Sequence, residues 1–420
     1  MGFILYIIYN VTAPLILPAA AFLSFLSPRH SFQENLSALK ERLFPAKFKF
    51  NSPPLWFHAA SLGEVRSIRK IIERLSTLEP ETPILITVST LTGRQEALKL
   101  TPYACVLPAD LFFLVKKFIS INKPRALFII ETELWPNLIR ITSQRLPVKL
   151  INARISDKTF SRYLKISPLL RYCLSKVVKV AAQSKKDAER YSRFIPSEKI
   201  SCAGNIKYDS MEISKDQAEK ESEKLSELLP KGLRVIVFGS THPDEEKIIS
   251  ESFRILTERN ESVAFVFVPR HINKVELLET ILKEGGMSYS KLSSLKKGEC
   301  SINPLLIVDE TGLLPAFYSL GEICFVGGTL DSTGGHNVLE PSIFSKPVIF
   351  GPNFANAAEA AERLIENKGG FIVKDSHELA ARIRILLNDR HALKKAGENS
   401  RKALDSLKGA TARIILEIIN

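Results

Sequence analysis

The chain has 420 residues, more than one hydrophobic core usually supports, so its length favours two domains of about 200 residues each. A hydrophobic content of 45% with 25% charged residues is typical of a globular protein and excludes a disordered one. The net charge of +13 indicates an anionic partner. The sequence contains no nucleic-acid-binding motif, so phosphorylated substrates or an acidic membrane surface are favoured over nucleic acid. Five scattered cysteines without CxxC spacing argue against a zinc site.

Residues 1–28 contain no charged side chain, and this stretch exceeds the roughly 20 residues that span a bilayer as a helix. We therefore predict a membrane anchor at residues 1–28. Asn10, Thr12, Pro14 and Pro18 weaken a straight span, so an interfacial anchor and a buried N-terminal helix are the alternatives. The basic flank at 29–49 places the body of the protein in the cytoplasm by the positive-inside rule.

After this segment, short apolar runs alternate with longer helical patterns in both halves of the chain. Runs rich in Val, Ile, Leu and Phe without polar alternation are typical of parallel strands covered on both faces. In the first half they are Leu55–Ala60, Ile84–Ser89, Ala126–Ile130, Val148–Ala153 and Val178–Ala182. In the second half they are Arg234–Phe238, Ala264–Val268, Leu305–Val308, Ile323–Val326, Pro347–Phe350 and Gly370–Val373.

Two such arrays predict an α/β fold with two Rossmann-like domains facing a central cleft. We place the first domain at 29–210 and the second at 232–420. The polar stretch between them, 211–231, reads as a linker or a solvated helix. Ligands should then bind at the carboxyl ends of the strands, where the polar motifs of this sequence fall.

Polar residues in the first domain follow the ends of its expected strands. Ser61 and Glu64 have the spacing of a helix capping box, which is the structural explanation, and Glu64 is alternatively a general base. Glu131 and Glu133 point opposite ways if the chain is extended, so we expect one to face the cleft and the other to cap a helix. Lys207 lies near the domain boundary, where it is either a phosphate ligand or a solvated lysine.

In the second domain, glycine pairs at 327–328 and 334–335 follow the fourth expected strand. Paired glycines let the backbone approach a ligand closely, and a loop ending at a helix N-terminus presents N–H groups to an anion. We therefore predict a phosphate or sugar-phosphate site, with a tight strand–helix turn as the alternative. Arg270 ends another strand and could bind a phosphate through two hydrogen bonds.

Motifs for several other chemistries are absent from the sequence. It contains no Walker lysine loop and no GxGxxG, which disfavours P-loop enzymes and nicotinamide or flavin dehydrogenases. It also contains no HExxH and no DxD, so we expect neither an essential metal nor a cofactor. His242, His271 and His336 lie in loops without matching carboxylate spacing, and we expect them to form hydrogen bonds rather than bind a metal.

Taken together, the motifs resemble those of the bacterial 3-deoxy-D-manno-octulosonic acid (Kdo) transferases of lipid A assembly. The resemblance covers the chain from Leu55 to about Asn356. In order, the motifs are HAASLGE, ETELWPN, NARIS, GNIKYD, GSTHPDEE, VPRH, FVGGTL and GGHNVLEP.

The resemblance implies a glycosyltransferase B (GT-B) fold, CMP-Kdo as donor and a lipid A precursor as acceptor, at a bacterial inner membrane with an anionic surface. It implies that Glu64 is the general base and that Glu131 and Lys207 stabilise the transition state. The implied CMP-binding residues are Pro269, Arg270, Thr311, Gly312, Leu313, Asn337, Val338, Leu339 and Glu340. Relatives often have Met-Gly-Glu where this chain has Thr-Gly-Leu, so an acidic role at Leu313 is in doubt.

We therefore expect an inverting transfer of Kdo from CMP-Kdo to a tetraacyl disaccharide bisphosphate, with the number of Kdo residues left open. Another GT-B nucleotide-sugar transferase or an epimerase is the alternative. A non-catalytic protein that binds phosphorylated lipid would explain the charge and the apolar N-terminus, but not polar motifs at the end of one strand after another.

Overall fold

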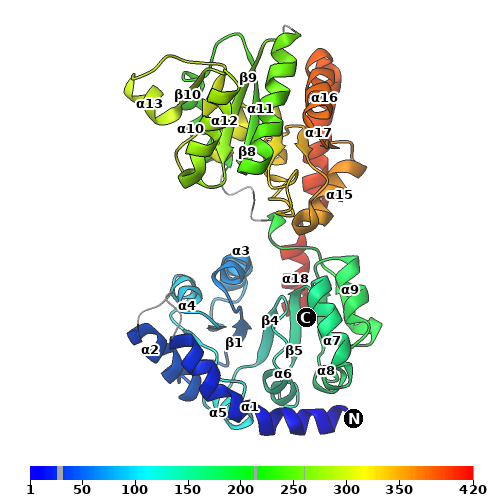
Figure 1. The fold of residues 1–420 in the computed structure, drawn as a ribbon. Coiled ribbons are helices and arrows are strands. Elements are labelled where there is room, and N and C mark those ends of the chain that lie inside the picture. Colours follow the sequence, from blue (N-terminus) through cyan, green and yellow to red (C-terminus); the bar gives the residue numbers. More distant parts are fainter. Residues whose placement is uncertain (26–31, 210, 212–214, 260, 420) are drawn as a thin grey trace. The chain divides into compact units, whose positions relative to one another are not determined.

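The computed structural model describes residues 1–25, 32–209, 211, 215–259 and 261–419. It divides the chain into two compact units. Unit 1 contains Met1–Ser210 and Lys408–Asn420, and unit 2 contains Met211–Leu407. Each unit has one parallel sheet with helices on both faces (Figure 1). The predicted α/β fold with two Rossmann-like sheets is confirmed.

The sheet of unit 1 has seven strands in the order β3-β2-β1-β4-β5-β6-β7. Its strands are β1 (Leu55–His58), β2 (Ile84–Val88), β3 (Ala104–Val106), β4 (Ala126–Ile130), β5 (Val148–Ala153), β6 (Lys179–Ala182) and β7 (Ile200–Cys202). Its helices are α1 (Gly2–Phe25), α2 (Phe32–Leu43), α3 (Leu62–Leu78), α4 (Leu91–Ala97), α5 (Phe112–Asn122), α6 (Pro136–Thr142), α7 (Asp157–Lys165), α8 (Ser167–Leu174), α9 (Lys185–Tyr191) and α18 (Ala410–Ile419).

The sheet of unit 2 also has seven strands, in the order β10-β11-β9-β8-β12-β13-β14. Its strands are β8 (Arg234–Thr241), β9 (Val263–Pro269), β10 (Tyr289–Lys291), β11 (Leu305–Ile307), β12 (Ile323–Val326), β13 (Val348–Phe350) and β14 (Gly370–Ile372). Its helices are α10 (Lys215–Ser226), α11 (Pro243–Glu258), α12 (Val275–Glu284), α13 (Leu292–Lys297), α14 (Leu314–Leu320), α15 (Ala358–Glu366), α16 (Ser376–Asn388) and α17 (Arg390–Leu407).

All eleven strands expected from the sequence are present, and β3, β7 and β10 are additional. The apolar runs lack alternation because both faces of each sheet are covered. In β1, Leu55 and Phe57 pack into one core cluster and Trp56 into the cluster on the opposite face. The missed strands have three residues each, too few to show a pattern.

The order of the strands creates a switch point in each sheet, where the chain passes from one side of the sheet to the other. In unit 1 this point lies between the neighbouring strands β1 and β4, and in unit 2 between β8 and β12. Loops that follow two such strands diverge and leave a crevice, which is where open α/β sheets bind ligands. The loops after β1, β4, β8 and β12 are therefore the first places to look for a site.

The stretch expected to be a linker differs in the structure. Residues 215–226 form α10, which packs against α14 inside unit 2, because Ala218, Ser222 and Leu225 give it a buried face. The described part of the expected linker is therefore mostly a helix of unit 2. Residues 212–214 lie outside the described part of the chain.

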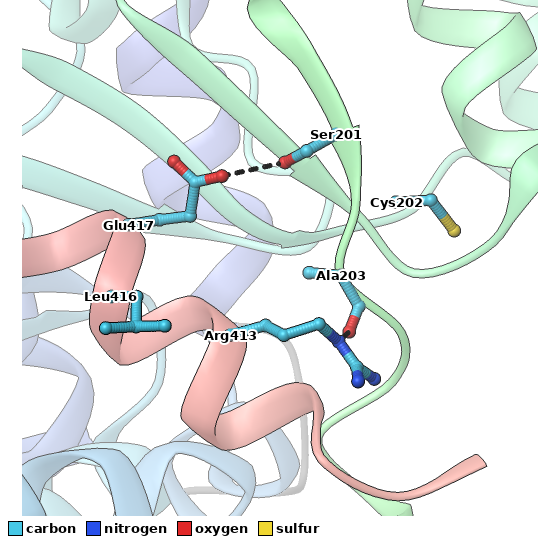
Figure 2. Close-up of a pocket in the computed structure, with 6 residues that line it drawn as sticks. All are labelled: Ser201, Cys202, Ala203, Arg413, Leu416 and Glu417. Atoms are coloured by element: carbon cyan, nitrogen blue, oxygen red, sulfur yellow. Dashed lines mark hydrogen bonds between the residues drawn. The ribbon is translucent and has the colours of Figure 1, made fainter. Parts of the chain in front are cut away.

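The chain also returns to unit 1 after unit 2 is complete. Helix α18 buries Ile414, Ile415 and Ile418 in the same core cluster as α3, and its red ribbon lies among the elements of unit 1 (Figure 1). Arg413 Nε donates a hydrogen bond to the Ala203 carbonyl oxygen at 2.7 Å. Ser201 Oγ donates one to Glu417 Oε1 at 3.1 Å, beside a pocket of about 310 Å³ (Figure 2). The domain expected at 232–420 therefore ends at residue 407, because the apolar face of α18 completes the core of unit 1.

The N-terminal segment corrects the predicted membrane anchor. Residues 2–25 form α1, but within the described residues no helix meets the length and apolarity needed to cross a membrane. Helix α1 instead has polar contacts with unit 1: Tyr6 Oη donates to Asn137 Oδ1 at 2.6 Å, and Tyr9 Oη donates to Asp110 Oδ2 at 2.7 Å. The absence of charge misled the prediction, because tyrosines can pair with polar groups of a folded domain. Residues 26–28 of the predicted anchor lie outside the described part.

A substitution at Gly397 would test the packing of unit 2. Gly397 lies in α17, and a Cβ there would overlap with the backbone carbonyl oxygen of Ser345. Gly397→Ala should lower the free energy of unfolding by about 1–3 kcal/mol, although alanine is the better helix former. Gly63→Ala in α3 is the matched control, since its Cβ would meet no atom closer than 3.9 Å. Thermal unfolding should show a lower midpoint for Gly397→Ala and an equal or higher one for Gly63→Ala. Equal midpoints would contradict the packing.

Candidate functional site

Glu64 lies just after the carboxyl end of β1, in the first turn of α3. Its Oε2 accepts a hydrogen bond from the Ala60 N–H at 2.7 Å, and its Oε1 accepts one from Ser61 Oγ at 3.2 Å. Ser61 Oγ also caps the helix by accepting from the Glu64 N–H at 3.3 Å. The capping interaction expected from the sequence is therefore present, and it holds the carboxylate at the edge of the sheet.

The electrostatic environment of Glu64 suits proton transfer near neutral pH. Burial, together with repulsion from Glu131 and Glu133, raises the pKa of Glu64 to about 7, against the hydrogen bonds from Ala60 and Ser61. A carboxylate with a pKa near 7 is available in its ionised form and is a stronger base than an ordinary glutamate. The geometry is therefore compatible with both roles considered for Glu64, helix capping and general base, since a capping carboxylate can also accept a proton.

Glu131 and Lys207 form an ion pair close to Glu64. Glu131 follows β4, the neighbour of β1, and its backbone has a φ of +56°, in the left-handed region. Lys207 Nζ lies 3.3 Å from Glu131 Oε1. A left-handed backbone is unfavourable for a residue with a side chain, so the fold must stabilise it. The structure therefore brings Glu64, Glu131 and Lys207 together, three residues that are far apart in the sequence.

Glu133, two residues on, has different partners, in agreement with the expectation that the two glutamates point different ways. Its Oε2 accepts a hydrogen bond from Trp135 Nε1 at 2.7 Å and lies 3.8 Å from His58 Nε2. Burial opposes ionisation, but His58 and Trp135 together keep the pKa of Glu133 below its usual value. Glu133 therefore stays ionised and adds to the negative field at Glu64.

A hydrogen-bond network that the sequence analysis missed positions the backbone of Lys207. Asn205 Oδ1 accepts from the Lys207 N–H at 3.0 Å, and Asn205 Nδ2 donates to Gln183 Oε1 at 3.2 Å. Gln183 Nε2 in turn donates to the Asn152 carbonyl oxygen at 3.0 Å, and Asn152 Oδ1 accepts from the Ile206 N–H at 3.2 Å. Only Gln183 follows an expected strand; Asn152 lies within one, and Asn205 follows β7, which was not expected, so the sequence carried little signal of this network.

In unit 2, Arg270 and Glu340 are the charged members of the predicted nucleotide site. Arg270 follows Pro269 at the end of β9, and its exposed guanidinium is close enough to Glu340 to act on that carboxyl. Burial raises the pKa of Glu340, while the hydrogen bond from Asn337 Nδ2 (3.4 Å) and the Arg270 charge lower it. Val338 and Leu339 are fully buried, so they anchor this segment in the core.

The other predicted nucleotide residues lie after β11, on the far side of β9 and β8 from the loop after β12. Thr311 and Gly312 are exposed, and Gly312 has a φ of +86°, which explains why glycine is needed at this turn. Leu313 precedes α14 as its N-cap residue. The segment therefore offers backbone groups and the Thr311 hydroxyl, and Leu313 itself provides no acidic group.

The glycine-rich loop after β12 differs from the expected anion cradle, because a carboxylate of the protein already occupies it. Glu245 Oε1 accepts hydrogen bonds from the Gly328 N–H at 2.7 Å and the His242 N–H at 3.1 Å, and its Oε2 accepts from the Leu330 N–H at 3.3 Å. A Cβ at residue 327 would overlap with Glu245 Oε1. Gly327 is thus required by Glu245, a residue for which the sequence analysis predicted no role.

Comparison with known proteins identifies the family to which this chain belongs. A family model described as 3-deoxy-D-manno-octulosonic-acid transferase (kdotransferase) matches residues 37–210. The 3-deoxy-D-manno-octulosonic acid transferase of Haemophilus influenzae is 31% identical over 415 residues, covering 96% of this chain and 95% of the relative. The chain belongs to the Kdo transferase family. It is therefore a glycosyltransferase.

A second relative contains a similar sequence within a larger protein. The bifunctional glycosyltransferase/methyltransferase of Fusobacterium nucleatum is 32% identical over 349 residues, and the match covers 80% of this chain. The present chain spans only about half of that relative's length, since the match covers 53% of it.

Solved structures agree on the fold. The UDP-GlcNAc 2-epimerase from Neisseria meningitidis aligns with a TM-score of 0.60 at 16% identity, covering 88% of this chain and 99% of the epimerase. At that identity the likeness shows the GT-B type of fold alone. Because epimerases and transferases share this fold, it is the family match that separates them here.

Removal of the Glu245 carboxylate should destabilise the loop after β12. Glu245→Ala leaves three N–H groups without their acceptor, and the buried one, that of Gly328, costs about 1–3 kcal/mol when it is unpaired. Amide hydrogen exchange should therefore rise sharply in peptides that contain Gly328 and Leu330, and the thermal midpoint should fall. Asp244→Ala, at the exposed neighbouring position, is the control and should change neither by much. Unchanged exchange in Glu245→Ala would show that Glu245 does not hold the loop.

Proposed function

We propose that this Kdo transferase family member transfers Kdo from CMP-Kdo to a lipid A precursor, with inversion at the anomeric carbon. The observation that carries the proposal is the group formed by Glu64, Glu131 and Lys207 at the switch point of unit 1, with the pKa of Glu64 raised to about 7 by burial. Family membership supports Kdo as the transferred sugar. The cytidine base and the lipid A acceptor rest on the motif resemblance.

In the proposed reaction, the Glu64 carboxylate takes the proton of an acceptor hydroxyl. The deprotonated acceptor oxygen attacks the anomeric carbon of Kdo from the side opposite the phosphate. The bond between Kdo and CMP breaks, and its electron pair stays on the phosphate oxygen of CMP. Negative charge therefore grows on the leaving nucleotide. Fixed positive groups that meet this charge lower the barrier because they need no reorganisation. Arg270, in unit 2, is the candidate for this role. Lys207, held by Glu131 in unit 1, is the transition-state stabiliser that the motif resemblance implies.

The nucleotide is assigned to the loops after β9, β11 and β12. Arg270 can form charge-assisted hydrogen bonds to a phosphate. Glu340 and Asn337 form a hydrogen-bonded pair whose oxygens can accept from ribose hydroxyls. Backbone groups at residues 311–313 are available to the base.

The acceptor is assigned to unit 1, and we place the protein at the cytoplasmic face of the bacterial inner membrane. Exposed apolar side chains of α1 and α5, among them Phe3, Ile7, Val11, Phe112 and Phe113, line a groove of about 400 Å³. This groove and a net charge of +13 fit contact with an anionic lipid surface, where an acylated acceptor is found. Mass spectrometry of a lipid A precursor incubated with CMP-Kdo tests the proposal and counts the added sugars. An unchanged acceptor mass would overturn it.

Glu64→Gln should reduce the transfer rate by about 10²–10⁴-fold, because the amide cannot accept the proton. In the wild type, the rate should fall about tenfold for each pH unit below about 7, as the raised pKa of Glu64 leaves less of the carboxylate ionised. Glu64→Gln should lose this pH dependence. Glu73→Gln, exposed on the same helix, is the matched control and should keep both rate and pH profile. A Glu64→Gln enzyme near the wild-type rate would exclude the base role.

Arg270→Ala should weaken CMP binding by roughly 10–100-fold, because a charge-assisted hydrogen bond to phosphate is worth about 1.5–3 kcal/mol. Calorimetric titration with CMP measures this, and Arg259→Ala, an exposed arginine of unit 2, serves as the control. Equal affinities for CMP and UMP in the wild type would argue for a different donor. Unchanged CMP affinity in Arg270→Ala would remove Arg270 from the donor site.

A further inference from the structure

Two histidines meet at the switch point of unit 2 and share a hydrogen bond. His242 follows β8 and is the N-cap residue of α11, whereas His336 lies in the loop after the neighbouring strand β12. Their Nε2 atoms are 2.8 Å apart. At this distance one ring must donate an N–H to the lone pair of the other. Only one proton fits between the two atoms, so the pair can carry no more than one positive charge while the contact lasts.

The charged groups around the pair are mostly positive. Arg270 and Lys274, from the segment after β9, lie within electrostatic range of His242. The ring of His271, from the same segment, has its centroid 5.6 Å from that of His242. The opposing charge is Asp331, whose Oδ2 lies 3.6 Å from His242 Nδ1. Glu245 completes the surroundings, but its carboxylate is held by backbone N–H groups.

These surroundings keep the pair neutral when no ligand is bound. Burial, together with His242 and Arg270, lowers the pKa of His336 to about 4, against Asp331. Burial and nearby cations also lower the pKa of His242, again against Asp331. The bound anion would favour protonation of this neutral imidazole pair, because a nearby negative charge stabilises the positively charged form of a histidine.

We propose that the His242–His336 pair binds the phosphate of the donor nucleotide and takes up one proton from solvent as it does so. The bridging proton stays between the two Nε2 atoms, and the added proton leaves both Nδ1 atoms as N–H donors. This proposal rests on the proposed function for the identity of the nucleotide, but the chemistry it names is that of a phosphate. Linkage requires that a ligand which raises proton affinity binds more tightly as the pH falls.

The proton has a consequence for the transfer step. A sugar-linked nucleotide phosphate carries one negative charge, whereas the departing monophosphate carries close to two at neutral pH, since its second pKa is about 6. A protonated histidine pair therefore stabilises the product side more than the reactant side. It adds a charge at the phosphate that the unliganded protein does not carry.

The test is calorimetric titration of the full chain with CMP, UMP, inorganic phosphate and cytidine between about pH 5.5 and about pH 8, in buffers with different ionisation enthalpies. We expect uptake of close to one proton more in the wild type than in His336→Gln. We also expect the affinity for the phosphate compounds to fall up to tenfold per pH unit more steeply in the wild type. Gln at position 336 keeps an N–H donor for His242 but cannot titrate. Cytidine should show no such difference, and His391→Gln, at an exposed position of α17, should behave like the wild type.

Equal proton uptake and equal pH slopes in the wild type and His336→Gln would overturn the proposal, even if His336→Gln binds more weakly, because weaker binding alone is compatible with a structural role. Binding of UMP in preference to CMP would contradict the assignment of CMP-Kdo as donor. Proton uptake by the histidine pair would then be measured with UMP. If none of the phosphate compounds bound at any pH, both proposals would be wrong.

Discussion

The parallel direction of the strands is the constraint on which both sites depend. Parallel strands end at the same edge of a sheet, so residues that follow different strands meet although they are far apart in the sequence. Glu64 after β1 meets Glu131 after β4, and His242 after β8 meets His336 after β12. Each meeting joins the two strands at which the order of the sheet reverses. On our two proposals, the same arrangement of strands serves proton transfer in unit 1 and anion binding in unit 2.

Two glutamates show how similar local sequences acquire different roles. Glu64 and Glu245 both lie in the first turn of a helix that follows a strand, and burial raises the pKa of each to about 7. Glu245 is fully buried and accepts three backbone N–H groups from two loops, so it serves as a tie within unit 2. Glu64 accepts from one N–H and one hydroxyl and is only partly buried, which leaves it accessible to a substrate. The number of hydrogen-bond donors, rather than the pKa, separates the structural carboxylate of Glu245 from that of Glu64, which we propose to be the general base.

Much of the fold could be predicted because apolar runs of four to six residues are a strong signal when both faces of a sheet are covered. The candidate site residues could be named from their positions after strands and from the motif resemblance. Contacts that depend on three-dimensional packing could not be predicted. Nothing local distinguishes Glu245 from an ordinary capping residue, and the role of Asn152 depends on a left-handed backbone and on two other loops. The uncharged N-terminus was misread for a similar reason, since the partners of Tyr6 and Tyr9 lie more than 100 residues away.

The return of α18 to unit 1 has a consequence for synthesis of the chain. Ile414, Ile415 and Ile418 belong to the core cluster that also contains β1 and α3, yet the ribosome makes them after the whole of unit 2. Unit 2 is continuous in sequence and can fold as soon as residue 407 has emerged. Unit 1 must wait for its last helix while carrying an uncovered apolar surface. The unit synthesised first is therefore the one completed last, and it is the one in which a nascent chain would need a chaperone.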